Sequence, residues 1–525
     1  MPRSVAPGGA DPALARRRTI SPSVPRARSE RAPLPTLGSV STTGDARRTT
    51  AADAGTAAQP AGVFAPAYRL ISVAVIAMVT IIAFEFMAIS TAMPAAAEEL
   101  GAVRSYGLAF SVMLTGQLLG IVLAGVWSDR SGPLPGLYAG QLLFAAGAAI
   151  CGLATSFPVL LVGRAVTGLG AGLVVVVLYV VVGRVYPTEL RPKVFAWISA
   201  AWVLPSLIGA PLSGWLTTAF TWRLVFWVVV PPALVTLGII VSQRRAISRT
   251  RDSEEAGARE GTERASHRRT AGLGVLVALA AGLVQLGTYD QVRLLSWETG
   301  AAVIGVVGLL LVTPRVLPPG TLRMARGVPS VIVSRFLLNG AFNGTITYVP
   351  LMLTQERGAT VTLAGVLLAI GSLGWSTGSW IQGRPRFTGR RWVLVSAGGA
   401  LLATGTLIMV VLTAAGLSEW FFAPAMVFAG LGMGLGSTSL SVILLDLVPV
   451  AEHSTASASL QLSDVLGSVI GIAAASALFA TLHTTGGDRH TYVVIWSVLA
   501  AVAALVVVSG RRCRAPSADD HVAAR

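Results

Sequence analysis

The segment Leu70–Pro94, LISVAVIAMVTIIAFEFMAISTAMP, is apolar over 25 residues and carries a single charge, Glu85. At a rise of about 1.5 Å per residue, an α-helix of this length crosses the hydrocarbon core of a bilayer. A carboxylate at that depth is costly unless it is protonated, paired with a cation or turned towards water. The segment therefore predicts a transmembrane helix and makes Glu85 a candidate functional residue.

The whole chain has the composition of a helical membrane protein. Of its 525 residues, 53% are hydrophobic and 12% charged, whereas soluble domains are about 25% charged. We expect no disulfide framework, because Cys151 lies in an apolar segment and Cys513 in a basic tail. The single lysine, Lys193, is followed by Val194, which excludes a Walker A loop and with it a P-loop ATP-driven pump.

The apolar residues fall into fourteen segments, each of which is a candidate span. They lie at 70–94, 107–127, 135–155, 158–183, 194–219, 223–242, 271–289, 299–314, 329–353, 362–382, 392–416, 420–446, 457–481 and 491–509. The eighth is the weakest, because it has only about 15 uncharged residues between Glu298 and Arg315, whereas a full span needs about 20. If it fails together with the seventh, twelve spans and a re-entrant pair are left.

Basic residues predict the orientation of these spans. With the N-terminus in the cytoplasm, 33 of the 40 Lys and Arg residues lie on the cytoplasmic side and five on the outside. This bias predicts a multi-pass plasma-membrane protein with both termini cytoplasmic. The formal net charge of +16 then reflects topology, so we expect no nucleic-acid partner. Residues 1–65 and 511–525 are expected to be cytoplasmic tails, the first of them disordered and basic.

The chain also repeats itself. Gly168-Leu-Gly-Ala-Gly172 in the fourth segment is echoed by Gly430-Leu-Gly-Met-Gly434 in the twelfth. We therefore expect two six-helix bundles, at 66–243 and 327–510. A cytoplasmic loop at 244–270 and two additional spans at 271–316 would lie between them. Internal repeats around a midplane cavity are typical of secondary transporters.

A charged turn follows the second segment, in Gly125-Val-Trp-Ser-Asp129-Arg130-Ser-Gly132. This stretch resembles the G-x-x-x-D-R-x-G loop between spans two and three of the major facilitator superfamily. The resemblance implies an all-α major facilitator fold with fourteen spans. It also implies a cytoplasmic latch made by Gly125, Asp129, Arg130 and Gly132. The alternative is an ordinary positive-inside turn.

The fifth segment carries Gly209, Ala210, Pro211 and Gly214. Their order resembles the antiporter signature G-x-x-x-G-P-x-x-G, with Ala210 in place of the glycine beside the proline. The resemblance implies a kinked, glycine-faced helix that packs against the opposite half and limits leak. It favours export over import.

Glu85 lies nine residues before Pro94 and is similar in position to the acid of span one in fourteen-span drug:proton antiporters. The resemblance implies that Glu85 carries the coupled proton and attracts a cationic substrate. Arg164, in a segment similar to the family's R-x-x-q-G-x-G pattern, is expected to face the cavity. The alternatives are that Arg164 snorkels to the interface, or that Glu85 and Arg164 form a permanent structural pair. Asp464 is a second candidate for proton coupling, unless solvent at its helix end simply hydrates it.

A polar stripe runs along the ninth segment. Asn339, Asn343 and Thr347 recur at four-residue spacing, with Tyr348 beside them. Such a stripe should face other helices or water, so these residues are candidates for substrate contact, with interhelical hydrogen bonding as the alternative. Arg335, near the start of the same segment, is expected to snorkel.

Trp202 and Trp375 lie within spans and are candidates to offer aromatic faces to a cation, with ordinary packing as the alternative. The resemblance as a whole implies a monomeric, proton-coupled exporter of amphipathic organic compounds. Its partners would be the small-molecule substrate, protons and the lipid bilayer. A proton-coupled importer of a small nutrient and a non-transporting membrane scaffold or sensor are the alternatives.

We expect no enzymatic activity, cofactor or metal. The chain contains no nucleotide-binding loop, and its five histidines lack the spacing of metal ligands.

Overall fold

The computed structural model describes residues 62–187, 189–248, 261–287, 297–318, 320–387, 389–449, 453–484 and 487–514. These residues all fall within the unit Pro60–Arg525. All regular elements in these ranges are helical, as a lipid environment requires, because an α-helix satisfies its backbone N–H and C=O groups internally. Most of the two expected tails lies outside the described residues.

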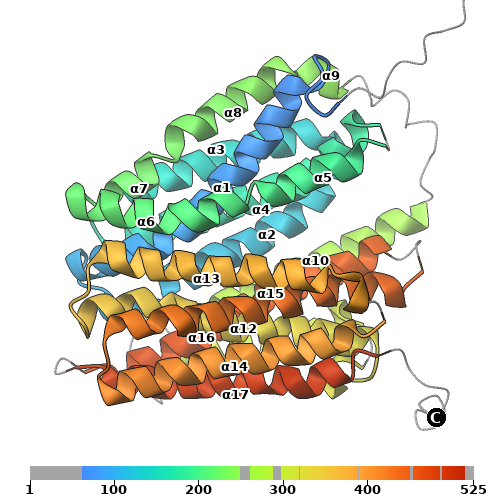
Figure 1. The fold of residues 1–525 in the computed structure, drawn as a ribbon. Coiled ribbons are helices and arrows are strands. Elements are labelled where there is room, and N and C mark those ends of the chain that lie inside the picture. Colours follow the sequence, from blue (N-terminus) through green and yellow to red (C-terminus); the bar gives the residue numbers. More distant parts are fainter. Residues whose placement is uncertain are drawn as a thin grey trace, which may run out of the picture. The chain divides into compact units, whose positions relative to one another are not determined.

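Figure 1 shows the helices in chain order. The first group comprises α1 (Arg69–Glu99), α2 (Leu108–Ser131), α3 (Pro133–Gly152), α4 (Phe157–Val185), α5 (Arg191–Ala200), α6 (Val203–Ala219), α7 (Arg223–Trp227), α8 (Val230–Ser242) and α9 (Arg244–Ser248). Between the halves lie α10 (Gly261–Leu286) and α11 (Trp297–Val316). The last group comprises α12 (Val328–Gln355), α13 (Val361–Gln382), α14 (Arg391–Ala415), α15 (Phe422–Leu447), α16 (His453–Leu482) and α17 (Arg489–Arg511). Short 3₁₀ turns are η1 (Val103–Ser105), η3 (Thr321–Arg323), η4 (Pro385–Phe387) and η5 (Glu419–Phe421).

The glycine repeat predicted from the sequence has the same structural role in both halves. A Cβ added to Gly168 in α4 would lie 1.9 Å from the carbonyl oxygen of Met113 in α2. A Cβ added to Gly430 in α15 would likewise lie 1.9 Å from the carbonyl oxygen of Gly371 in α13. Both distances are far below van der Waals contact, so only glycine permits these helix pairs to approach so closely. The two halves therefore share one packing arrangement.

The expected fifth span, 194–219, is interrupted. Helix α5 ends at Ala200 and α6 begins at Val203. Pro205 explains the interruption, because it has no N–H to donate to the carbonyl of Ala201 and its ring crowds that carbonyl. The chain still runs on in the same apolar stretch, Lys193–Ala219, which is long enough to cross a membrane.

Helix α6 lies between α1 and the other half of the chain. A Cβ on Gly209 would be 3.3 Å from Cβ of Met87 in α1. A Cβ on Gly214 would be 2.6 Å from Cα of Thr362 in α13. Pro211 lies inside α6 between these two glycines. The segment that resembles the antiporter signature thus packs closely against the opposite half.

Eleven helices of the described residues are long and apolar enough to cross a membrane, by length and composition alone. Helix α12 is not among them, since its polar stripe lowers its hydropathy. The apolar parts of α10 and α11, Gly272–Leu286 and Thr299–Arg315, are shorter than the roughly 20 residues of a full span. The eighth segment is short, as the sequence indicates, the seventh is short as well, and a count of fourteen spans stays a prediction.

One of the two middle helices, α10, packs on the rest of the bundle. Helix α10 begins at Gly261, ten residues before the predicted span at 271. Its Gln285 donates hydrogen bonds to the carbonyl oxygen of Ser111 (3.0 Å) and to the hydroxyl of Thr115 (2.6 Å), both in α2. An apolar cluster that includes Leu114 of α2, Val277 of α10 and residues of α16 is buried beneath it. Helix α10 is thus joined to helices of both halves.

Candidate functional site

A cavity lies between the two halves. It encloses about 780 Å³, including the part that is open to solvent. Its lining comes from α1, α2, α4 and α6 of the first half and from α12, α13, α15 and α16 of the second. Aromatic and methionine side chains make up much of the wall, namely Phe86, Met87, Phe110, Met113, Phe342, Trp375 and Met426. The polar lining residues are Ser90, Arg164, Ser206, Asn343, Thr347 and Ser372.

Hydrogen bonds join the two halves near the Glu99 end of α1. The Gln355 amide of α12 donates to a carboxylate oxygen of Glu98 at 2.9 Å. The Tyr106 hydroxyl donates to the main-chain carbonyl of Thr347 at 3.0 Å. Tyr348, predicted to touch substrate, is fully buried here, with its ring centroid 5.5 Å from that of Tyr106. Tyr348 is not among the residues that line the cavity.

Glu85 and Arg164 form a buried ion pair at the wall of the cavity. Each is only 1% exposed, and the Arg164 guanidinium donates to Oε1 of Glu85. Arg164 also donates from Nε to the carbonyl oxygen of Ala109 (2.9 Å) and from Nη2 to Sδ of Met113 (3.0 Å). Arg164 lines the cavity, so it does not snorkel to the interface. The structure brings together the two residues that the sequence indicated as partners.

The second carboxylate oxygen of Glu85 is in a different situation. Oε2 is buried and has no hydrogen-bond partner among the described residues. A buried charged oxygen without a partner is costly, and a proton placed on it removes the charge. The Glu85 carboxylate therefore offers an open position for a proton while Oε1 stays against Arg164.

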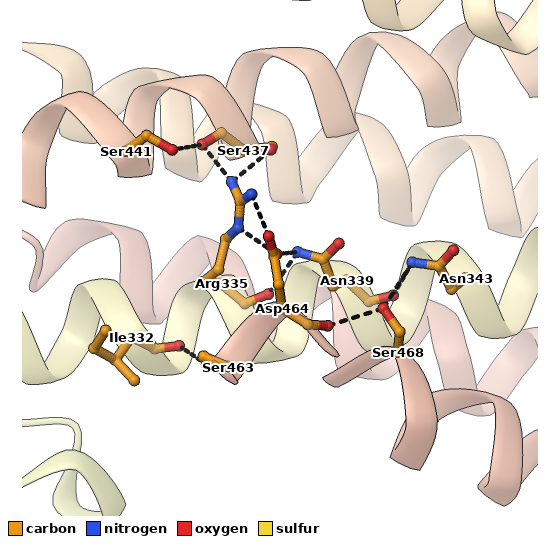
Figure 2. A network of polar contacts seen from close by, with 9 residues as sticks. All are labelled: Ile332, Arg335, Asn339, Asn343, Ser437, Ser441, Ser463, Asp464 and Ser468. Atoms are coloured by element: carbon orange, nitrogen blue, oxygen red, sulfur yellow. Dashed lines mark hydrogen bonds and ion pairs between the residues drawn. The ribbon is translucent and has the colours of Figure 1, made fainter. Parts of the chain in front are cut away.

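A second acid–arginine pair lies in the other half (Figure 2). Arg335 of α12 donates from Nε and Nη2 to the two carboxylate oxygens of Asp464 in α16, the latter contact at 2.6 Å. Its Nη1 donates to the carbonyl oxygen of Ser437 in α15 at 2.6 Å. The side chains of Arg335 and Asp464 are 12% and 17% exposed. The prediction that Arg335 snorkels is wrong, because its guanidinium binds two neighbouring helices.

The polar stripe of α12 divides between two roles. Asn339 donates to Asp464 and belongs to the ion-pair network, not to the cavity lining. Asn343 and Thr347 line the cavity. Asn343 also donates to the hydroxyl of Ser468 in α16 at 3.0 Å, so the network reaches from Asp464 to the cavity wall (Figure 2). Both interpretations of the stripe thus apply: Asn339 bonds to another helix, Thr347 lines the cavity, and Asn343 does both.

The two tryptophans are separated in the structure. Trp375 lines the cavity and packs edge to face on Phe342, with ring centroids 5.4 Å apart. Trp202 lies between α5 and α6, is 39% exposed and is not part of the lining. Of the two expected aromatic faces, Trp375 is therefore in the cavity wall, together with phenylalanines that no sequence pattern indicated.

The latch motif is described only in part. Gly132 connects α2 to α3 with a φ of 77°, a conformation that favours glycine. Gly125 has open space where a Cβ would lie. The side chains of Asp129 and Arg130 lie outside the described residues. Among the residues that the structure describes, no group of three His, Cys, Asp or Glu side chains could hold a metal ion.

Comparison with known proteins gives one family match and several relatives. The sequence pattern of the Major Facilitator Superfamily matches residues 75–471. A triacylglyceride transporter of Mycolicibacterium hassiacum is 31% identical over 402 residues, covering 70% of each chain. A multidrug efflux pump of Staphylococcus aureus is 24% identical over 445 residues, covering 83% of this chain and 94% of that protein.

An uncharacterized transporter of Mycobacterium tuberculosis is 27% identical over 414 residues. The match covers 74% of this chain and 56% of that protein, so the chain spans little more than half the length of that relative. Among solved structures, a peptide transporter in complex with sulfate superposes with a TM-score of 0.61 at 14% identity, covering 85% of this chain and 96% of the other. That likeness concerns the fold alone.

Proposed function

Because the chain belongs to the Major Facilitator Superfamily, we propose that it is a proton-coupled exporter of amphipathic organic compounds that works by alternating access. The observation that carries the proposal is the Glu85–Arg164 pair. It combines a buried carboxylate that has one unpartnered oxygen with an arginine that lines the cavity. The resemblance to a multidrug efflux pump supports export of drug-like compounds.

The Glu85–Arg164 pair can make a proton and a cationic ligand compete. With Glu85 ionised, its charge offsets that of Arg164, and the cavity wall is neutral at this point. When Glu85 takes up a proton, Arg164 faces the cavity with an uncompensated positive charge. A cation about 6 Å from that charge is disfavoured by roughly 3 kcal/mol at an effective dielectric constant of about 20.

This competition links transport to the proton gradient. A bound cation disfavours protonation of Glu85 as strongly as protonation disfavours the cation, because coupling between two ligands is reciprocal. Exchange of one for the other on each side of the membrane is antiport. In this mechanism Glu85 acts through Arg164 and need not touch the substrate.

Asp464 is proposed as a second, weaker coupling site. Its side chain is partly exposed, and its hydrogen-bond network reaches the cavity through Asn339 and Asn343. Both of its oxygens accept hydrogen bonds from Arg335 or Asn339. A proton there must displace existing contacts, so we assign the main coupling role to Glu85.

The proposal is tested by a drug-susceptibility panel in a host from which its own efflux pumps have been deleted. Wild type should raise resistance to several amphipathic compounds. Glu85→Gln, which keeps size and removes the titration, should abolish that resistance at equal expression. If Glu85→Gln protects the host as well as wild type does, the proposed coupling is wrong.

Transport direction is measured in everted membrane vesicles. An exporter takes substrate into such vesicles when their interior is acidic and releases protons in exchange. Movement of substrate and protons in the same direction would instead identify an importer. Absence of movement of every compound would favour a scaffold or sensor.

A further inference from the structure

The hydroxyl groups that line the cavity have already used their hydrogen atoms. Ser90, Ser206, Thr347 and Ser372 each donate to a main-chain carbonyl three or four residues earlier in their own helix, at 2.7, 2.7, 2.7 and 3.5 Å. A hydroxyl group has one hydrogen to donate and two lone pairs to accept with. Towards the cavity, these four side chains are therefore ready to accept hydrogen bonds without losing a bond of their own.

Asn343 presents an acceptor for the same reason. Its amide nitrogen donates to the carbonyl oxygen of Asn339 (3.1 Å) and to the hydroxyl of Ser468 (3.0 Å). Ser468 in turn donates its hydrogen to the carbonyl oxygen of Asp464 at 2.9 Å, so towards Asn343 it can only accept. These partners fix which end of the amide is nitrogen. The Oδ1 atom is left to accept from a ligand.

Arg164 is the charged donor in the cavity lining, and three of its five N–H groups are engaged by Glu85, Ala109 and Met113. The indole N–H of Trp375 is a further donor in the wall and has no hydrogen-bond partner among the described residues. While Glu85 is ionised, the polar part of the cavity accepts hydrogen bonds at five side chains, and its donors are limited to Trp375 and the remaining N–H groups of Arg164.

We propose that this cavity selects amphiphiles whose head group donates hydrogen bonds, such as a protonated amine with at least one N–H, over quaternary ammonium compounds and carboxylates. This inference rests on the proposed function and adds the chemistry of its substrate. An N–H donor finds acceptors at Asn343 and Thr347, while the apolar body packs on Phe86, Phe110 and Phe342. A quaternary ammonium has the same charge and nearly the same bulk but nothing to donate. A carboxylate brings acceptors to a wall that already consists mainly of acceptors.

The test uses three compounds with one aromatic body and different head groups: a dimethylammonium with one N–H, its trimethylammonium analogue and the matching carboxylate. Binding to purified full-length protein in lipid nanodiscs is measured at a pH where Glu85 is ionised. The dimethylammonium compound should bind about tenfold more tightly than the trimethylammonium compound, which corresponds to about 1.4 kcal/mol. The carboxylate should bind most weakly.

Two variants connect the preference to the acceptors. Thr347→Val and Asn343→Leu keep approximate volume and remove the accepting oxygen. Each should weaken binding of the dimethylammonium compound several-fold and leave that of the trimethylammonium compound unchanged, which also reports that the variant is folded. Trp375→Phe removes the indole donor from the wall and should leave the preference intact.

Equal binding of the two cations, tightest binding of the carboxylate, or equal weakening of both cations by Thr347→Val would overturn the inference and leave the proposed function standing. Failure of wild type to bind or transport any compound would contradict the proposed function itself, and the inference would fall with it.

Discussion

The two halves of the molecule each hold an acid–arginine pair, and the pairs differ in burial and in partners. Glu85 and Arg164 have side chains 1% and 2% exposed, whereas Asp464 and Arg335 have 17% and 12%. Glu85 uses one carboxylate oxygen and leaves the other unpartnered. Asp464 uses both, one of them shared with Asn339. The Glu85–Arg164 pair is buried and leaves one carboxylate oxygen without a hydrogen bond. The Asp464–Arg335 pair is partly exposed, and both carboxylate oxygens accept hydrogen bonds.

This difference suits one pair to taking up a proton and the other to holding helices together. In the buried Glu85–Arg164 pair, Oε2 of Glu85 can gain a proton without breaking the contact between Oε1 and Arg164. A pair bound at both oxygens holds α12, α15 and α16 together, and its protonation requires an existing hydrogen bond to be given up. We therefore expect the pair in the first half to sense protons and the pair in the second half to hold its helices together.

The largest contrast should come from removing each arginine. Arg164→Ala leaves Glu85 as an uncompensated buried charge, which is expected to lower the free energy of unfolding by about 3–5 kcal/mol. Arg335→Ala should lower it by about 1–3 kcal/mol, because Asp464 keeps Asn339 and partial contact with solvent. Thermal unfolding of the purified variants measures both. Equal losses would show that the two pairs do not differ as described.

The glycine contacts should respond equally in the two halves. Gly168→Ala and Gly430→Ala each place a Cβ 1.9 Å from a carbonyl oxygen of the neighbouring helix. Helix separation or overpacking is expected to lower stability by about 1–3 kcal/mol in each variant. Gly183→Ala, which lies in α4 with Gly168 and has open space at that position, is the matched control and should keep wild-type stability. A large effect in only one half would contradict the shared packing.

The smallest effect is expected from Asp464→Asn. The substitution keeps an oxygen for Arg335 and for Asn339 but removes the negative charge. Proton-driven transport should fall about threefold, which corresponds to less than 1 kcal/mol, while the pH dependence of ligand binding stays as in wild type. Uptake into everted vesicles and direct binding at several pH values provide the two measurements. Loss of the pH dependence would make Asp464, and not Glu85, the main coupling acid.

Much of this arrangement could be predicted from the sequence, because apolar length, glycine repeats and the scarcity of charge are local signals. The pairing of Glu85 with Arg164 was predictable, since a buried arginine needs a carboxylate and few acids lie within the spans. The pairing of Arg335 with Asp464 was not. Arg335 lies near a helix end, where snorkelling is usual, and sequence alone does not show which way the helix turns it.

Other features depend on packing that no local pattern reports. Asn343 lines the cavity while Asn339, one turn away on the same stripe, does not. Trp202 and Trp375 look alike in sequence, yet Trp375 alone of the two reaches the lining. The difference arises from where α12, α13 and α6 meet their neighbours.

The central claim is that protonation of Glu85 unmasks the charge of Arg164 and expels a cationic ligand. Binding of a protonated amine to wild type and to Glu85→Gln, measured across pH in nanodiscs, tests it most directly. Wild-type affinity should fall at least tenfold as the pH is lowered and Glu85 takes up its proton. The Glu85→Gln variant should bind weakly at every pH, as protonated wild type does. If Glu85→Gln binds the amine tightly, or if wild-type affinity does not change with pH, the coupling is not carried by this pair.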